Sequence, residues 1–212
     1  MFTGGLQEVR TVPTELSTPA GALAAALRAD PNGPLLTYYD EQTGERTELS
    51  ARTLDNWVCK TANLLVDGAG LTVDDPVAVL LPAHWQTAAV LLGCLAAGTP
   101  VRTAPVTGHN ADPVEVAFGT PARLADVRTL RPAETYLLGL APMAAPLAEL
   151  PPRTADYVLE VRAFGDNFAA PLPDPAGTAL LDPVPVSHRE LVERAAAHAG
   201  GAGLHRGGRL LI

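Results

Sequence analysis

The chain has few side chains of the kinds that bind metals or form covalent intermediates, and their spacing argues against both. The five histidines are His84, His109, His188, His198 and His205. None lies at HxxxH spacing from another or pairs with a cysteine at ligand spacing, so we expect no metal site and no other cofactor. The sequence also contains neither a GxSxG nucleophile elbow nor a GxGxxG dinucleotide turn. These patterns therefore identify no catalytic residue.

The two cysteines, Cys59 and Cys94, each fall inside an apolar pattern with helical spacing. This pattern favours two buried thiols over a disulfide or a metal pair. The start of the chain lacks the basic residues and continuous apolar run of a signal peptide, and the most apolar helix, of about 14 residues, is too short to cross a bilayer. We therefore expect a soluble, cytoplasmic protein with reduced thiols and no membrane contact.

His84 and Trp85 are the candidate ligand-binding residues that the sequence yields. They follow an apolar run at residues 77–81 that is typical of a buried parallel strand. Open α/β sheets bind ligands at the carboxyl ends of their strands, which is where these two side chains fall. The alternative is a helical turn packed under a loop, and we favour that structural role.

These residues belong to the central strand–helix–strand unit of the chain. The apolar run 77–81 lies between two prolines, and residues 84–97 are apolar nearly all round and stop at Gly98. A second apolar run, 99–103, follows at once, which indicates a right-handed parallel crossover. A helix without a polar face must be covered on its outer side. The side chains that we expect to be fully buried on it are Val90, Leu91 and Leu95.

The flanking segments predict more helices and strands. Thr18 caps a helix that runs to about residue 29, two strand-like runs at 35–40 and 46–49 form a hairpin, and Ser50 caps a helix to about residue 66. Trp57 in that helix is expected in the core. Later elements are expected at strands 114–119, 135–140 and 209–212, at helices 121–130, 155–164 and 187–199, and at a helical turn within 143–150.

The alternation predicts an α/β fold in three layers, with a mostly parallel sheet, helices on both faces and an N-terminal β-hairpin. Residues 1–17 show no periodicity and form a lead-in, and 18–212 form a single domain. A proline-rich stretch at 165–186 is expected to be an extended loop.

The hairpin that runs into Leu49 and Ser50, the segments TANLL, VDDPVAVLLP and LAAGTPV, and their order resemble the amino-terminal part of the adenylate-forming superfamily. That superfamily contains acyl-CoA synthetases, peptide-synthetase adenylation domains and luciferases. The resemblance covers residues 35–104. It implies the fold of these enzymes, and the chain is most similar in type to short, single-domain proteins that match only their front part.

One segment departs from the superfamily pattern. In those enzymes a segment similar to VSHRELVERA directly follows a lysine-containing Gly/Ser/Thr-rich loop that holds the ATP phosphates. Here residues 179–186 read ALLDPVPV, where Pro183 and Pro185 supply no N–H donors and Asp182 would repel phosphate. Lys60, the one lysine, matches neither lysine of the superfamily. The sequence also stops about where the adenine pocket and the magnesium-binding acid would begin.

These observations favour a non-catalytic homologue that acts as a binding or scaffolding module without ATP-dependent adenylation. Two alternatives stay open. The protein could bind a small acyl-like or nucleotide-like molecule near His84 and Trp85, or it could be one part of a split ligase that a second chain completes.

The net charge of the chain and the edge of its predicted sheet indicate which kinds of partner it could bind. The net charge is −8 and no basic stripe is present, which argues against nucleic acid. A sheet that stops at residue 212 would leave an uncovered edge, so we expect a protein partner or a homodimer. The alternative is that the proline-rich stretch 142–186 folds back and covers that edge.

Overall fold

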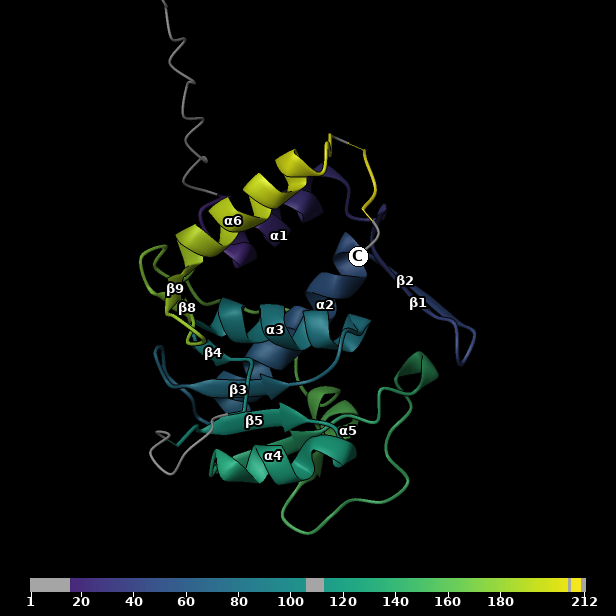
Figure 1. The fold of residues 1–212 in the computed structure, drawn as a ribbon, viewed down its shortest axis with the longest axis vertical. Coiled ribbons are helices and arrows are strands. Elements are labelled where there is room, and N and C mark those ends of the chain that lie inside the picture. The colour runs from purple at the N-terminus through teal and green to yellow at the C-terminus, as the bar shows by residue number, and fades with distance from the viewer. Residues whose placement is uncertain (1–15, 106–112, 206, 211–212) are drawn as a thin grey trace, which may run out of the picture.

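The computed structural model describes residues 16–105, 113–205 and 207–210, and Figure 1 shows their arrangement. The larger sheet has seven strands in the order β7-β6-β5-β3-β4-β8-β9. All its pairings are parallel except that of β8 with β9. Its strands are β3 Val77–Leu80, β4 Val101–Arg102, β5 Val116–Gly119, β6 Glu134–Leu137, β7 Ala155–Asp156, β8 Thr178–Leu180 and β9 Val186–Ser187.

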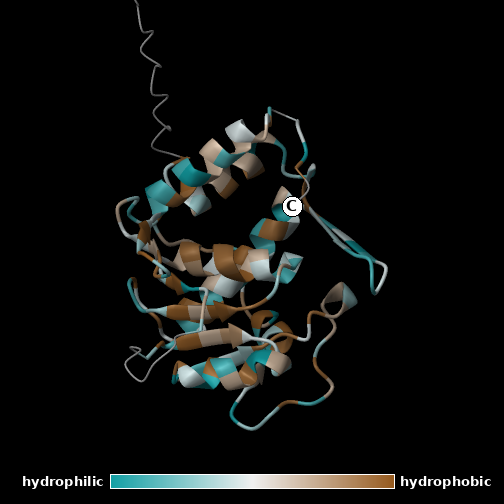
Figure 2. Cartoon of the chain, viewed as in Figure 1, coloured by the Kyte–Doolittle hydropathy of each residue, from teal (hydrophilic) through white to brown (hydrophobic). Residues whose placement is uncertain are grey.

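Helices cover both faces of this sheet. The helices of the described residues are α1 Pro19–Ala29, α2 Ala51–Asn63, α3 Trp85–Ala97, α4 Leu124–Thr129, α5 Tyr157–Val161 and α6 His188–Gly201, of which α1 packs on α2, α3 and α6 and not on the sheet. Side chains of β3 alternate between two hydrophobic clusters, because successive residues of a strand point to opposite faces. Val77 and Val79 join the large cluster with α2, α3 and α5, whereas Ala78 and Leu80 pack with α4. The predicted three-layer α/β fold is confirmed, and Figure 2 shows the apolar centre formed by β3, β5 and α3.

A β-hairpin stands apart from the large sheet. Strands β1 Pro34–Asp40 and β2 Glu45–Ser50 pair antiparallel, with Tyr38 opposite Thr47. The hairpin leads directly into α2, where the Ser50 hydroxyl accepts a hydrogen bond from the Thr53 N–H at 3.1 Å. The predicted hairpin and its junction with the helix are confirmed.

The predicted helix boundaries agree with the observed caps. Thr18 caps α1, and Ser187 caps α6 by accepting from the Glu190 N–H. Helix α3 starts after His84 and ends at Gly98, whose φ of +76° is the left-handed conformation that glycine adopts without steric cost. Helix α2 ends in a π-helical turn, Leu64–Gly68, and short 3-10 turns occur at Pro121–Arg123 and Pro142–Ala144.

The C-terminal third differs from the prediction in three places. The predicted helix 155–164 begins with strand β7, and only Tyr157–Val161 is helical, because buried Asp156 pairs in the sheet and then caps α5 through the Leu159 N–H. The predicted loop 165–186 contains strand β8, which pairs with β4. Residues 209 and 210 of the predicted strand 209–212 are not in a strand. Residues 211 and 212, and most of the lead-in 1–17, lie outside the described residues.

Two predictions of burial were wrong. Leu91 is half-buried, whereas Val90 and Leu95 are buried as expected. Cys59 is half-buried, whereas Cys94 is fully buried.

The segment 142–187 supplies both edges of the large sheet, since it contains β7 at one end and β9 at the other. Each edge strand is two residues long. Short edge strands offer few unpaired backbone groups to another chain. Within residues 16–105, 113–205 and 207–210, no helix is long and apolar enough to cross a membrane.

Candidate functional site

His84 lies at the N-terminus of α3, beside the carboxyl end of β3, as the sequence predicts. Its Nδ1 accepts a hydrogen bond from the Gln86 N–H at 3.1 Å, and only 7% of its surface is exposed. Burial lowers the pKa of the imidazole, although the carboxylates of Glu45 and Asp40 act in the opposite direction. The ring is therefore neutral at neutral pH. Because Nδ1 is an acceptor, the proton of the neutral ring is on Nε2.

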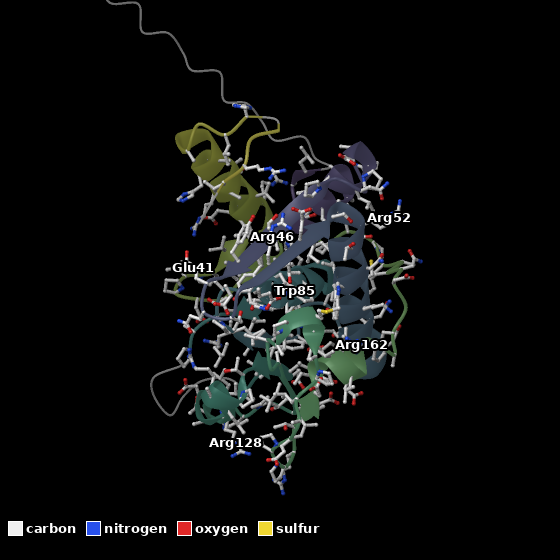
Figure 3. All side chains as sticks on the ribbon, turned by 90° about the vertical axis from the view of Figure 1, so that its right-hand side faces the viewer. Glu41, Arg46, Arg52, Trp85, Arg128 and Arg162 are labelled. Carbon is white, nitrogen blue, oxygen red and sulfur yellow. The ribbon has the colours of Figure 1, made fainter. Side chains whose placement is uncertain are left out.

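Aromatic side chains surround this histidine. The Tyr38 ring of the hairpin meets the His84 ring edge-on with centroids 4.4 Å apart, and the Trp85 ring lies 5.6 Å from it. Trp85 in turn contacts Trp57 of α2, at 5.3 Å between centroids. Figure 3 places Trp85 near the middle of the molecule, below Arg46 of the hairpin. The rings of the two predicted site residues therefore lie beside each other. Tyr38 joins them, because the hairpin packs its ring against His84.

Polar atoms at this helix end lack partners. His84 Nε2, Trp85 Nε1 and both amide atoms of Gln86 are buried and make no hydrogen bond within the part of the chain that the structure describes. Trp85 is 3% exposed and Gln86 is fully buried. A buried polar group without a partner costs roughly 1–3 kcal/mol, so a cluster of them at one helix end favours a ligand-binding role.

A separate apolar groove runs between α1, α3 and α6. It encloses about 520 Å³. In Figure 1, α6 and α1 lie side by side above α3. All the side chains that line the groove are apolar: Pro19, Ala22, Leu23, Ala26, Leu35, Leu54, Ala88, Leu91, Leu92, Leu95, Leu191, Val192 and Ala195. Leu91 is only half-buried because α1 and α6, which lie over α3, leave this groove open between them and α3.

The groove follows one stripe of α3, on which Ala88, Leu91 and Leu95 lie. His84 is the N-cap of α3 and has an extended backbone, with φ of −163° and ψ of 155°, so helical spacing does not place its side chain on this stripe. Gln86 lies on another stripe with Gly93, where α3 meets Thr61 of α2. Neither His84 nor Gln86 is among the residues that line the groove.

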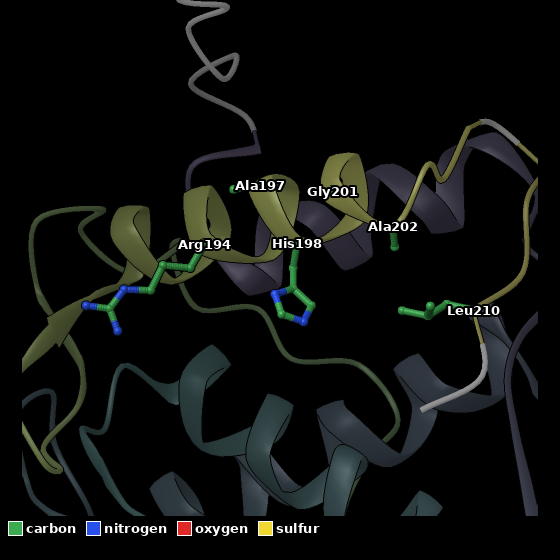
Figure 4. A pocket seen from close by; sticks show the side chains of 6 residues that line it. All are labelled: Arg194, Ala197, His198, Gly201, Ala202 and Leu210. Atoms are coloured by element: carbon green, nitrogen blue, oxygen red, sulfur yellow. The ribbon is translucent and has the colours of Figure 1, made fainter.

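A second hollow lies under the C-terminal half of α6. It encloses about 650 Å³ and is lined by Arg194, Ala197, His198, Gly201, Ala202 and Leu210. Figure 4 shows that Arg194 and His198 leave α6 on the same side. This hollow brings together no buried polar group. Among the described residues, no three His, Cys, Asp or Glu side chains are close enough to share a metal ion.

The segment between β8 and β9 lies where the resemblance to adenylate-forming enzymes would place a phosphate loop. Asp182 in this segment accepts a hydrogen bond from Arg102 of β4 at 2.8 Å. Sequence reasoning missed this ion pair, because the two residues are 80 positions apart. Lys60 lies in α2 and donates from Nζ to the Phe164 carbonyl oxygen. The side chains of Arg102 and Lys60 are therefore both bonded within the protein, and neither is free to bind a phosphate.

The parallel sheet, its helices and the N-terminal hairpin are those of the amino-terminal part of an adenylate-forming enzyme. A family model described as AMP-binding enzyme matches residues 23–108, which confirms the resemblance predicted from residues 35–104. An acyl-CoA synthetase from Brucella canis superposes with a TM-score of 0.62 and 21% identity over 79% of this chain and 33% of its own. For the anthranilate CoA ligase AuaEII the TM-score is 0.64, with 13% identity over 81% of this chain and 35% of the ligase.

The chain thus spans about a third of the length of these enzymes, and identities this low establish the fold alone. A protein of Mycobacterium tuberculosis named "TIGR03089 family protein" is more similar in sequence. It is 39% identical over 209 residues, which are 95% of this chain and 79% of the relative. The chain belongs to this TIGR03089 family.

Proposed function

We propose that this protein is a binding homologue of adenylate-forming enzymes that does not itself adenylate, and that it holds a small apolar molecule in the groove between α1, α3 and α6. The observation that carries the proposal is the groove itself, about 520 Å³ lined only by apolar side chains. A concave apolar site of this size is typical of small-molecule binding. An exposed apolar surface that binds nothing would otherwise promote aggregation of the protein.

The segment between β8 and β9 supports the absence of adenylation. Transfer to the α-phosphate of ATP needs positioned cations or N–H donors that neutralise charge in the transition state. Pro183 and Pro185 supply no N–H, and Asp182 holds the Arg102 guanidinium. Lys60 is engaged with the Phe164 carbonyl. The segment is therefore built to close the sheet and not to hold a nucleotide.

A scaffolding role is the second candidate. The same groove would accept apolar side chains of a partner protein or of a second copy, and Leu35 at its rim is 47% exposed. A ligase completed by a second chain is the third candidate, and it would need that chain to supply the phosphate site. We favour the small-molecule ligand, because apolar side chains of α1, α3 and α6 converge on one groove of about 520 Å³.

Two substitutions on α6 test the groove. Both Ala195 and its neighbour Ala196 are exposed on α6, but only Ala195 lines the groove. Ala195→Trp should fill the groove and weaken binding of 1-decanol at least ten-fold in calorimetry, and Ala196→Trp should leave it unchanged. Absence of 1-decanol binding to the unsubstituted protein, or equal weakening by both substitutions, would contradict a ligand site here.

Calorimetry with MgATP tests the second half of the proposal. We expect no binding heat and no acyl-adenylate with fatty or aromatic acids. A dissociation constant below about 100 μM, or roughly −5.5 kcal/mol, would show that the non-adenylating assignment is wrong.

A further inference from the structure

We infer that the turn end of the hairpin, residues 38–47, is held against α3 by neutral His84 and is released when this histidine takes up a proton. The contact is separate from the apolar groove, so this device and the proposed ligand site can fail independently of each other. Three features of the molecule support it: the cap of α3, the thin packing of the hairpin, and the carboxylates at the hairpin turn.

His84 caps α3 only in its neutral form. Its Nδ1 accepts a hydrogen bond from the Gln86 N–H at 3.1 Å. A protonated imidazole carries an N–H on both nitrogens and has no acceptor, so it cannot make this bond. The positive end of the helix dipole lies at the same place and disfavours a cation there. Protonation therefore drives the ring out of the position in which it caps the helix.

The same ring supports the turn end of the hairpin. Tyr38 meets it edge-on, with ring centroids 4.4 Å apart, and is itself half-buried. At the base of the hairpin, Leu49 is the one fully buried side chain within residues 34–50. A two-stranded hairpin is at best marginally stable on its own in water. Loss of the contact with His84 should therefore release the turn end, while Leu49 keeps the base attached.

The charged groups that act on His84 lie at the hairpin turn. Burial lowers the pKa of the imidazole, whereas the carboxylates of Glu45 and Asp40 raise it. Tyr38 also faces the ring, and its hydroxyl stays neutral because burial, Asp40 and Glu45 all raise its pKa. Neither α3 nor residues 81–83 carry an acidic or basic side chain. The two hairpin carboxylates therefore set how far the pH must fall before the ring takes up its proton.

The docked hairpin leaves a polar atom of the ring without a partner. His84 Nε2 is buried and makes no hydrogen bond within the part of the chain that the structure describes. A buried donor in this state has lost its hydration without gaining a bond in return. When the protonated ring leaves the cap, water can hydrate both of its N–H groups. This recovered hydration brings the docked and released arrangements closer in free energy, as a two-state device requires.

Hydrogen exchange of the full chain, read by mass spectrometry and corrected for the intrinsic pH dependence of exchange, tests the inference. Because burial lowers the pKa of His84 below its ordinary value of 6.5, the hairpin is docked at pH 7.5 and is released only as the pH falls below 6.5. Between pH 7.5 and 5.0, we expect the protection of residues 38–47 to fall about ten-fold more than that of residues 89–97 in α3. Equal loss in the two segments would overturn the inference, because it would indicate general unfolding.

The carboxylates give a second readout, which a merely structural role of His84 would not move. Asp40→Asn combined with Glu45→Gln keeps hydrogen-bond acceptors at both positions but removes the charges that act on the ring. The midpoint of release should move about half a pH unit lower. Glu48→Gln is the matched control, since this hairpin carboxylate bonds to Arg46 and should leave the midpoint in place. An unchanged midpoint in the double variant would contradict release through His84.

Substitution of the histidine removes the proton acceptor itself. Asn is a good N-cap residue and does not titrate in this range, so His84→Asn retains a capping side chain for α3. The protection of residues 38–47, relative to that of residues 89–97, should then be the same at pH 7.5 and 5.0. A release that keeps its pH dependence in His84→Asn would show that another group controls the hairpin.

Discussion

Gly93 of α3 and Thr61 of α2 approach so closely that no side chain fits between them. A Cβ atom at Gly93 would lie 2.5 Å from Thr61 Cβ and 3.2 Å from the Val58 carbonyl oxygen. Thr61 cannot easily turn away, because its hydroxyl donates to the Trp57 carbonyl at 2.8 Å and lies 2.7 Å from the Tyr157 hydroxyl. This close crossing fixes α3, and with it the groove and His84, against the rest of the core.

Gly93→Ala should therefore destabilise the protein by about 1–3 kcal/mol, because overpacking at the crossing exceeds the gain in helix propensity. Urea unfolding measures the change. Gly200 of α6 is the matched control, since a Cβ there meets nothing within 4 Å. Gly200→Ala should be neutral or stabilising by up to about 1 kcal/mol. Equal effects of the two substitutions would show that the α2–α3 contact is looser than described.

The sequence predicts the centre of this fold well because the centre is encoded locally. His84 and Gly98 mark the ends of α3 through capping chemistry that is visible in consecutive residues. Strands β7 and β8 were missed, because each has only two or three residues and pairs with a strand distant in the sequence. Runs this short show no periodicity, so tertiary pairing alone defines them.

The candidate site was predictable in part. The position of His84 and Trp85 follows from the rule for the carboxyl ends of parallel strands. The groove does not follow from the sequence, because α1 and α6 contribute to it from opposite ends of the chain. The full burial predicted for Leu91 was wrong for a related reason. The sequence shows that Leu91 is an apolar residue on a helix, but it does not show how closely other elements pack over it.

The two cysteines should react at very different rates. Burial raises the pKa of the Cys94 thiol to about 12, and no part of this residue is exposed. Cys59 is half-buried, and its pKa is raised chiefly by burial and then by Asp55. A maleimide at pH 7.5 should label Cys59 slowly and Cys94 only after unfolding in urea, as peptide mass spectrometry would show. Rapid native labelling of Cys94 would contradict the central place of α3.

The ion pair between Arg102 and Asp182 should stabilise the turn between β8 and β9. The two side chains are only 18% and 20% exposed, and the Nη1–Oδ1 distance is 2.8 Å. Asp182→Asn should cost about 2 kcal/mol, because it leaves the guanidinium charge without its partner. The double substitution Arg102→Met with Asp182→Leu should recover most of this loss in urea unfolding. A single substitution without effect would indicate that the pair is solvated.

Acid should destabilise the protein through His84 and His188. Burial lowers the pKa of both below the ordinary value of 6.5, against the opposing effect of Asp40 and Glu45 on His84 and of Asp174 on His188. Below pH 6.5 the unfolded chain binds protons that the folded protein excludes, so stability is complete above this pH and falls as the pH decreases toward the folded-state pKa values.

Urea unfolding at pH 7.5 and 5.5 should show the loss. The loss should shrink in a variant with His84→Asn and His188→Gln, and should stay the same in His198→Gln, whose histidine is exposed on α6. A pH-independent stability, or an equal effect of all these substitutions, would show that burial of the two rings is not maintained in solution.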